Sequence, residues 1–231
     1  MPTYFEKCPS FADAVAPPAE VNAAGEAADS TASVTSIKTK EFLDAADGVV
    51  GVFVLLNSTA LGLVQNDLQG NIKKLRERCE NFPNTSSTLE EIVKDEAKEA
   101  EGKSDKERKK IKKATESLLW LTRGLSFTCK GLSNARKDKN QSLSASFQAA
   151  YTETLEVYHG FLVKKAIGLA LKACPTRETL IAKLGGVEAT EAASVEGEVS
   201  KDLEIWLAAL ETIVKHIQAF FLAGKYDADF A

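Results

Sequence analysis

The sequence predicts an all-α protein. In the part of the chain that follows residue 38, apolar residues recur every three to four positions, and no stretch shows the strict alternation typical of a strand. Two capping boxes, in which Ser or Thr is followed three residues later by Glu, mark helix starts at Thr88 and Ser104. With 231 residues, of which 44% are hydrophobic, the chain can bury a sizeable helical core.

The N-terminal extension, residues 1–38, differs from the domain expected at 39–231. It is rich in Ala, Ser and Thr, holds four of the six prolines and has little periodicity. Such a segment is expected to be partly disordered or docked on the surface. The rings of Tyr4, Phe5 and Phe11 are the side chains that would dock it.

The first half of the domain is predicted to contain three helices. Apolar spacing places two of them at about 40–56 and 59–79, and the polar stretch 81–87 reads as a loop. The capping box at Thr88 begins the third helix, which Gly102 ends.

Longer helices are predicted in the second half. The capping box at Ser104 begins a helix that runs to about residue 132, and another spans about 143–173 before a proline. A short helix at about 176–185 ends at a pair of glycines, which is a helix-end signal. The last helix is expected at about 199–223.

Composition excludes several functional classes. A net charge of −4 argues against a general nucleic-acid binder. The four widely spaced cysteines indicate reduced thiols rather than a metal site or disulfides. Because we find neither a signal peptide nor an uncharged apolar run of about 18 residues, we expect a cytoplasmic protein with at most peripheral membrane contact. The basic run at 103–113 either solvates a helix start or touches an anionic membrane.

Polar side chains line one edge of the second predicted helix. Asp67, Asn71 and Lys74 have i, i+4 and i+7 spacing, so they fall within roughly 60° of one another on a helix with about 100° per residue. Further along the chain, Trp120 and Arg123 share a face of another predicted helix. Charged groups buried in this way require partners.

These residues have two interpretations. One is an internal salt bridge of Asp67 with Lys74 or Arg123, beside a core histidine, His159, that lies next to Tyr158 inside the predicted helix 143–173. The other is a recognition site, because a carboxylate and an amide can grip neighbouring hydroxyls. An indole face suits a sugar ring, and a neutral imidazole can donate to a carbonyl. This second set fits a sugar joined to an amide.

Three segments in this order, NDLQGNIKKL, SLLWLTRGLSF and EVYHGFLVKKAIGLAL, resemble the glycolipid transfer protein family. The resemblance covers about residues 39–226. It implies a two-layer helical sandwich enclosing an apolar lipid tunnel. It also implies non-vesicular transfer of glycosphingolipids between membranes by a soluble, non-enzymatic carrier, without cofactor or metal, which we expect to be a monomer.

Positions that match the family motifs imply a lipid-binding site. Asp67, Asn71 and Lys74 would bind sugar hydroxyls, and Asp67 would also accept from the amide N–H of ceramide. Trp120 would stack on the first sugar, and His159 would donate to the amide carbonyl. Additional head-group contacts are expected at Arg123, Tyr158 and Tyr226. The lipid-chain tunnel is expected along Phe53, Leu61, Val64, Phe161, Val163 and Trp206.

The sequence is also compatible with other functions. Some relatives carry ceramide-1-phosphate, and Lys74, Arg78 and Arg123 could hold such a phosphosphingolipid. A helical lipid-sensing or scaffold module is a second alternative, although we find no sustained heptads. An enzyme with Asp67 and His159 as an acid–base pair lacks an accompanying nucleophile or metal motif. The chain also departs from the best-known members of the family at Phe161, where they have Trp.

Overall fold

The computed structural model describes residues 2–16, 36–56 and 61–230. Within these ranges the chain forms α-helices and short 3-10 turns, and the only strand-like pairs are isolated bridges between Val15 and Ile37 and between Lys38 and Thr88. The prediction of an all-α protein is confirmed.

Ten α-helices lie in the described part of the chain. They are α1 Tyr4–Lys7, α2 Thr39–Leu56, α3 Gly62–Asn81, α4 Leu89–Glu99, α5 Asp105–Ile111, α6 Lys113–Lys137, α7 Leu143–Thr154, α8 Phe161–Lys172, α9 Arg177–Gly185 and α10 Ala192–Gly224. Short 3-10 turns lie at Phe11–Ala14, Pro83–Thr85, Glu156–Tyr158 and Ala189–Glu191.

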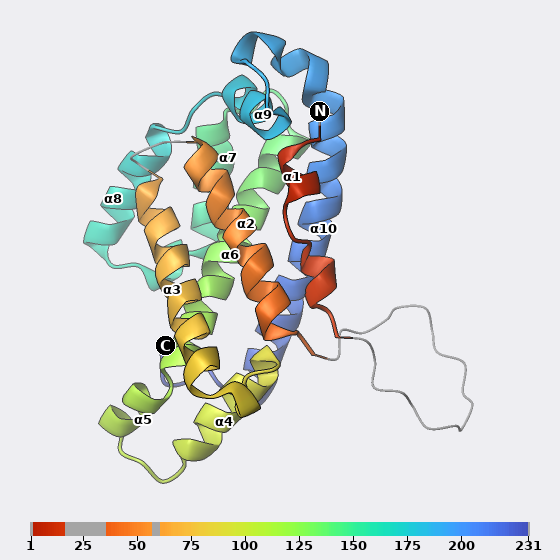
Figure 1. Ribbon diagram of the computed structural model, residues 1–231. Coiled ribbons are helices and arrows are strands. Elements are labelled where there is room, and N and C mark those ends of the chain that lie inside the picture. Colours follow the sequence, from red (N-terminus) through yellow and green to blue (C-terminus); the bar gives the residue numbers. More distant parts are fainter. Residues whose placement is uncertain (1, 17–35, 57–60, 231) are drawn as a thin grey trace, which may run out of the picture.

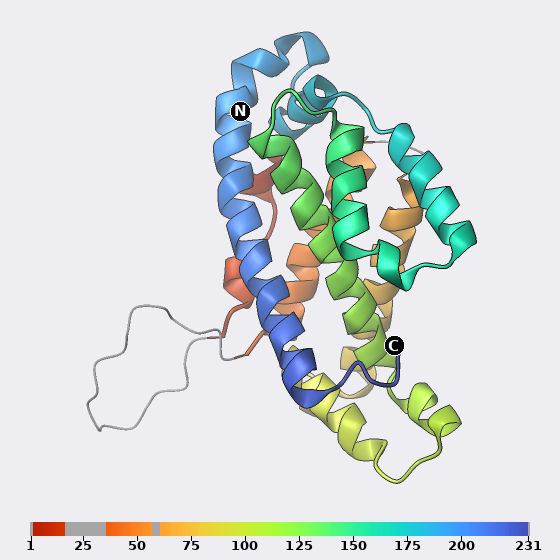
Figure 2. The same ribbon diagram turned by 180° about the vertical axis from the view of Figure 1, so that it is seen from behind.

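The long helices form two layers. Figure 1 shows α2 and α3 side by side in front of α6, α7 and α10, and Figure 2 shows the second layer from behind. Helix α9 covers one end of the sandwich, and α4 and α5 lie at the other. The main hydrophobic cluster gathers side chains from both layers, because each long helix turns its apolar face inward.

Helix α10 belongs to this core. The stretch Ala189–Gly224 is long and apolar enough to cross a membrane by length and composition alone. Its inward side chains Leu203, Leu210 and Ile217 are nevertheless buried, and α10 packs against α6 and α9. The apolar character of α10 is therefore used in packing the second layer.

The start of the N-terminal extension lies against the helical domain. Phe5 and Phe11 are buried, and their ring centroids lie 5.1 Å and 5.9 Å from that of Trp206 on α10. Residues 2–16 thus cover the outer side of α2 and α10. The expectation of disorder falls on residues 17–35, which lie outside the described residues.

Both predicted capping boxes begin helices. At the start of α4 the Thr88 hydroxyl accepts from the Glu91 N–H (3.2 Å), and the Glu91 carboxylate accepts from the Thr88 N–H (3.1 Å). Ser104 and Glu107 make the same arrangement at α5. The glycine signal also holds, because α9 ends at Gly185 and is capped by Gly186 with φ +71°.

The helix predicted from Ser104 to about residue 132 is wrong as one element. It breaks at Lys112, and α6 begins anew at Lys113. The buried carboxylate of Glu96 on α4 accepts from the backbone N–H groups of Ala114 (3.1 Å) and Thr115 (2.8 Å). These bonds satisfy the first amides of α6, so the new helix start is stabilised from a distant part of the chain.

The helix predicted over 143–173 is also wrong as one element. Helix α7 ends at Thr154 and α8 begins at Phe161, so Tyr158 and His159 lie in the break between them. His159 has an extended backbone (φ −103°, ψ 135°). Gly160, the residue before α8, is extended as well, and glycine is a weak helix former.

Other helix boundaries also differ from the prediction, and α6 ends at Lys137, beyond the predicted end at about residue 132. Helix α10 begins at Ala192, seven residues before the predicted start at 199. The added residues have little apolar periodicity, so helical spacing did not include them. Helix α3 begins at Gly62 in the structure, and part of the predicted start at 59 lies outside the described residues.

Close packing between α6 and α7 depends on a glycine. A Cβ at Gly131 would lie 2.5 Å from two carbons of the Phe147 ring. We therefore expect Gly131→Ala to lower the free energy of unfolding by about 1–3 kcal/mol, as overpacking does, in urea denaturation. Gly70→Ala on α3 is the matched control, because a Cβ there meets nothing within 4 Å and Ala favours the helix. Equal stability of the two variants would contradict this account.

Candidate functional site

Helix α3 presents the predicted polar stripe. Asp67, Asn71 and Lys74 lie on successive turns of one side of the helix. Asn71 is 5% exposed, and its side-chain N–H donates to the backbone carbonyl of Asp67 at 2.9 Å. This bond fixes the amide plane, so the amide oxygen has a defined direction.

The Asp67 carboxylate has no ion-pair partner among the residues that the structure describes. Within the described ranges neither Lys74 nor Arg123 approaches it to within 4.0 Å, so the internal salt bridge is not formed. Asp67 lies exposed at the rim of the site, yet the protein around it removes water from the carboxylate and thereby raises its pKa. The charges of Lys74 and His159 and a hydrogen bond from Asn71 oppose this rise.

Helix α6 places Trp120 and Arg123 beside this stripe. The centre of the Arg123 guanidinium lies 4.7 Å from the Trp120 ring centroid and 3.6 Å from that of Tyr158. Arg123 is buried, its Nη1 has no hydrogen-bond partner among the described residues, and burial lowers its pKa. Arg123 therefore holds the two aromatic rings through cation–π contacts.

The break between α7 and α8 supplies the third part of the site. The His159 ring stacks on Trp120, with centroids 6.0 Å apart and planes 9° apart. Its Nδ1 lies 3.0 Å from the Tyr151 hydroxyl. Burial lowers the pKa of His159, more than Asp67 raises it, so the imidazole is neutral at pH 7. Three elements thus bring the five predicted head-group residues to one rim.

A continuous series of aromatic contacts leads from this rim into the interior. The His159 and Tyr151 centroids are 5.7 Å apart, and Tyr151 lies 6.4 Å from Phe127. Phe127 in turn contacts Phe147 (5.4 Å), which contacts Phe53 on α2 (6.5 Å). The series crosses from α7 to α6 and back, and ends between the two layers.

The predicted tunnel residues fall into two groups. Four of them, Phe53, Leu61, Val64 and Trp206, are buried. Phe161 and Val163 at the start of α8 are 68% and 45% exposed. They adjoin the exposed side chains Val157 and Leu162, so the beginning of α8 presents an apolar rim to solvent.

The C-terminal tail passes close to the site, but among the described residues Tyr226 makes no ring contact with Trp120, Tyr158 or His159. Tyr226 packs on Phe220, with centroids 4.9 Å apart. Its neighbour Asp227 shares a hollow of about 220 Å³ with Arg123 and Tyr158. The tail is held to α5 and to the α5–α6 junction by Asp229, whose carboxylate accepts from Arg108 and Lys112 at 2.6 Å each.

Tyr151 and Phe127 were not predicted from the sequence. Both are ordinary members of apolar helix faces in α6 and α7, and both are buried. The only signal for Tyr151 was a phenol hydroxyl on a core face, which requires a hydrogen-bond partner when buried.

The sequence is similar to that of a known protein family. A family model described as Glycolipid transfer protein (GLTP) matches residues 37–186. The sequence is 37% identical over 189 residues to a glycolipid transfer protein of Aureobasidium melanogenum, which covers 82% of this chain and 85% of that protein.

Solved structures of similar fold include a fungal one. The crystal structure of HET-C2, a fungal glycolipid transfer protein, matches with a TM-score of 0.73 and 33% identity over 95% of this chain and 96% of that one. A structure of FAPP2, which selects simple glycosphingolipids with this fold, matches with a TM-score of 0.76 and 27% identity over 99% of both chains. A mouse ceramide-1-phosphate transfer protein has a TM-score of 0.74 at 17% identity, a likeness of fold alone.

Proposed function

Because the chain belongs to the glycolipid transfer protein family, we propose that it carries glycosphingolipids between membranes, one lipid at a time. The observation that supports this most is the meeting of Asp67 and Asn71 with the stacked rings of Trp120 and His159. Hydroxyl-binding groups lie beside a flat apolar surface there, which is what a sugar ring requires. No covalent bond is made or broken in this process.

Each part of the site has a role in head-group binding. The Asp67 carboxylate accepts from sugar hydroxyls and from the amide N–H of ceramide, while Asn71 and Lys74 bind further hydroxyls. The sugar ring lies on the open part of Trp120. When the Tyr151 hydroxyl donates to Nδ1 of neutral His159, the opposite N–H of the ring donates to the amide carbonyl.

The contacts that the basic residues already make favour a sugar head group over a phosphate. Arg78 is buried and paired with Asp95. Arg123 is buried beneath the rings of Trp120 and Tyr158. Two of the three cations proposed for a phosphate are therefore already engaged. This arrangement supports glycosphingolipid ahead of ceramide-1-phosphate.

The lipid chains enter between the two layers. Each buried CH₂ group contributes about 0.8 kcal/mol, so two long chains are held in a bilayer by well over ~15 kcal/mol, and a carrier must offer comparable apolar depth. The aromatic series that begins at Tyr151 runs from the head-group rim to Phe53. The tunnel opens along this series when these side chains move apart to admit the lipid chains.

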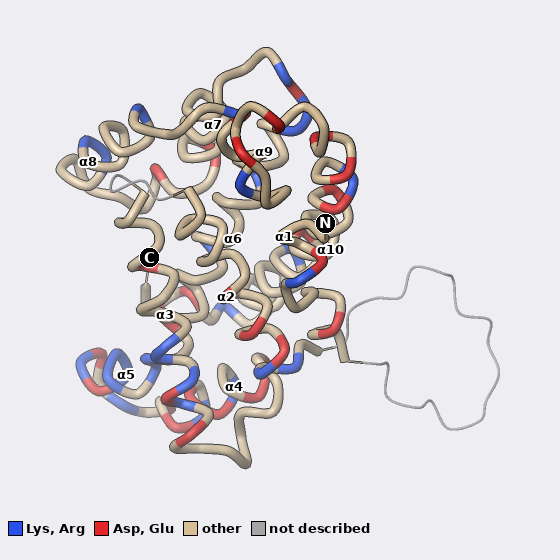
Figure 3. The backbone as a smooth tube through the Cα atoms, turned by 45° about the horizontal axis from the view of Figure 1, so that its top comes forward, with Lys and Arg blue, Asp and Glu red and all other residues tan. Residues whose placement is uncertain are grey.

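The start of α8 makes transient contact with the membrane. Phe161 and Leu162 are exposed next to the head-group site, where a lipid leaves the bilayer. Figure 3 shows that Lys and Arg residues also gather on α5. Basic residues near an anionic surface contribute about 1 kcal/mol each. A monomer in the cytoplasm, where the unpaired cysteines stay reduced, satisfies all of these requirements.

Phe161→Ser is expected to weaken binding to vesicles about tenfold, which corresponds to a loss of ~1.4 kcal/mol. The reason is that the exposed ring no longer enters the interface. Vesicle co-sedimentation measures the change. Ile205→Ser on α10 is the matched control, because Ile205 is similarly exposed (63%) on another helix. An equal loss in both variants would contradict the assignment of α8 as the membrane contact.

Side-by-side transfer of labelled glycosylceramide and labelled ceramide-1-phosphate between vesicles tests the proposed function. We expect the purified protein to move the sugar lipid alone. Movement of the phosphate lipid alone would assign the site to phosphosphingolipid, and movement of neither would favour a lipid sensor or scaffold.

A further inference from the structure

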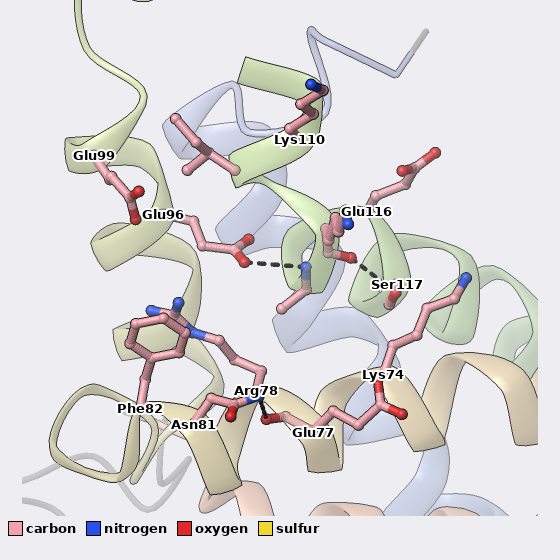
Figure 4. Close-up of a pocket in the computed structure, with 13 residues that line it drawn as sticks. Lys74, Glu77, Arg78, Asn81, Phe82, Glu96, Glu99, Lys110, Glu116 and Ser117 are labelled. Carbon is pink, nitrogen blue, oxygen red and sulfur yellow. Dashed lines mark hydrogen bonds between the residues drawn. The ribbon is translucent and has the colours of Figure 1, made fainter. Parts of the chain in front are cut away.

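A polar cleft continues the head-group site along α3. It has a volume of about 640 Å³ and lies between α3, α4 and the α5–α6 junction (Figure 4). Lys74 belongs both to this cleft and to the Asp67–Asn71 stripe. The stripe extends to Arg78, and the seven-residue rise from Asn71 to Arg78 spans about 10 Å at ~1.5 Å per residue. A head group longer than one sugar would reach this cleft.

The cleft is lined by charges of both signs. Four cations (Lys74, Arg78, Lys110 and Lys113) and four carboxylates (Glu77, Glu96, Glu99 and Glu116) face it. Figure 4 shows Lys110, Glu99 and Glu116 around its mouth. Among the described residues these three side chains make no hydrogen bond or ion pair. Free donors beside free acceptors, at balanced charge, suit neutral hydroxyls better than an anion.

An aromatic ring lies at the far end of the cleft. Phe82 is 49% exposed, and the Arg78 guanidinium lies over its ring at 3.9 Å. Arg78 is held by Asp95 and lies near the Thr85 hydroxyl, and its Nε has no partner within the described part of the chain. An exposed ring at one end of a polar cleft offers the apolar face of a sugar a second stacking surface, in addition to the one that Trp120 offers in the head-group site.

Hydrogen bonds tie the wall of the cleft together. Glu96, 2% exposed, accepts from two α6 amides and from the Thr115 hydroxyl at 2.7 Å. These bonds join α4 to the start of α6 on both sides of the cleft. A site whose walls are fixed beforehand loses little freedom on binding.

We propose that this cleft is a second carbohydrate subsite, which binds the sugars beyond the first in a neutral glycosphingolipid with a short oligosaccharide head group. The first sugar lies on Trp120, and the outer sugars extend past Lys74 toward Phe82. The proposal rests on the proposed function, since the ceramide and first sugar place the outer sugars.

Competition between vesicle-borne lipids tests it. The wild-type protein is offered neutral ceramides with one, two or three sugars, and the bound fraction of each is measured at equilibrium. Phe82→Ala is expected to lower binding of the three-sugar lipid about threefold to tenfold, the scale of one aromatic contact, with the one-sugar lipid unchanged. Glu99→Ala is expected to act in the same direction. Asn84→Ala, an exposed neighbour of Phe82 outside the cleft, is the matched control.

The possible results separate the two proposals. Unchanged three-sugar binding by Phe82→Ala and Glu99→Ala, with normal one-sugar binding, overturns the second subsite and leaves the proposed function standing. No binding of any sugar lipid by the wild type overturns the proposed function. Preference for a sulfated head group over the neutral one assigns the cleft to anions and overturns the proposal. A free trisaccharide that binds as well as the three-sugar lipid would show a soluble-sugar site and also overturn it.

Discussion

Asp67→Asn is expected to slow glycosylceramide transfer about tenfold to hundredfold, because charge-assisted hydrogen bonds to the sugar and amide contribute roughly 1.5–3 kcal/mol. The ligand-free variant should be at least as stable as the wild type. Burial raises the pKa of Asp67 in the folded state, so its protonated form stabilises the fold below the unfolded-state pKa. That contribution is lost as the pH rises through the folded-state pKa, and at pH 7 the carboxylate opposes folding.

Transfer rates and urea denaturation at pH 7 check both halves of this expectation. Glu80→Gln is the matched control, because Glu80 is an exposed carboxylate on the same helix, away from the stripe. A fall in the free energy of unfolding that accompanies the loss of transfer would assign Asp67 a structural role instead. Transfer by wild type should decline on acidification, beginning above the ordinary carboxyl pKa, since Asp67 then loses its charge.

Trp120→Ala is expected to reduce transfer by well over about tenfold. The sugar loses its stacking surface, and His159 and Arg123 lose the ring that orients them, so several contacts of about 0.5–1.5 kcal/mol each disappear together. Trp120→Phe keeps an aromatic face and should recover most of the activity. The same vesicle assay measures both.

The control for this pair is the other tryptophan. Trp206→Phe should lower the free energy of unfolding, because Trp206 is buried against Phe5 and Phe11. As a predicted tunnel residue outside the head-group site, it should change transfer of ceramide and of glycosylceramide alike, whereas Trp120→Ala should act on the sugar lipid. Equal transfer by Trp120→Ala and the wild type would remove Trp120 from the proposed site.

Local patterns were sufficient for the fold class and for most helix starts. Capping boxes involve residues three apart, so Thr88 and Ser104 were readable directly. The two helix breaks were not readable in this way. The start of α6 depends on Glu96, which is seventeen residues earlier than Lys113 and approaches only in the folded chain. The turn before α8 brings His159 to Tyr151, a contact that helical spacing does not predict.

The parts of the candidate site that lie on regular helices could be predicted from helical spacing, and the other parts could not. The stripe on α3 and the Trp120–Arg123 face follow from helical spacing, and the structure brings them together. The exposure of Phe161 and Val163 was not predicted, because the phase of α8 is set by its new start at Phe161. The interior aromatic series required knowledge of which helices pack, and Tyr151 and Phe127 were therefore missed. The head-group roles stay predictions.

The two tryptophans lie in different environments, so the intrinsic fluorescence of the chain can report ligand binding. Trp206 is buried against Phe5 and Phe11, so we expect its emission to be blue-shifted and unaffected by a ligand at the rim. Trp120 is partly exposed and stacked on an imidazole, so its emission responds when a ligand covers it or moves His159. A spectral shift during titration with unlabelled lipid therefore reports occupancy of the head-group site against a constant internal reference.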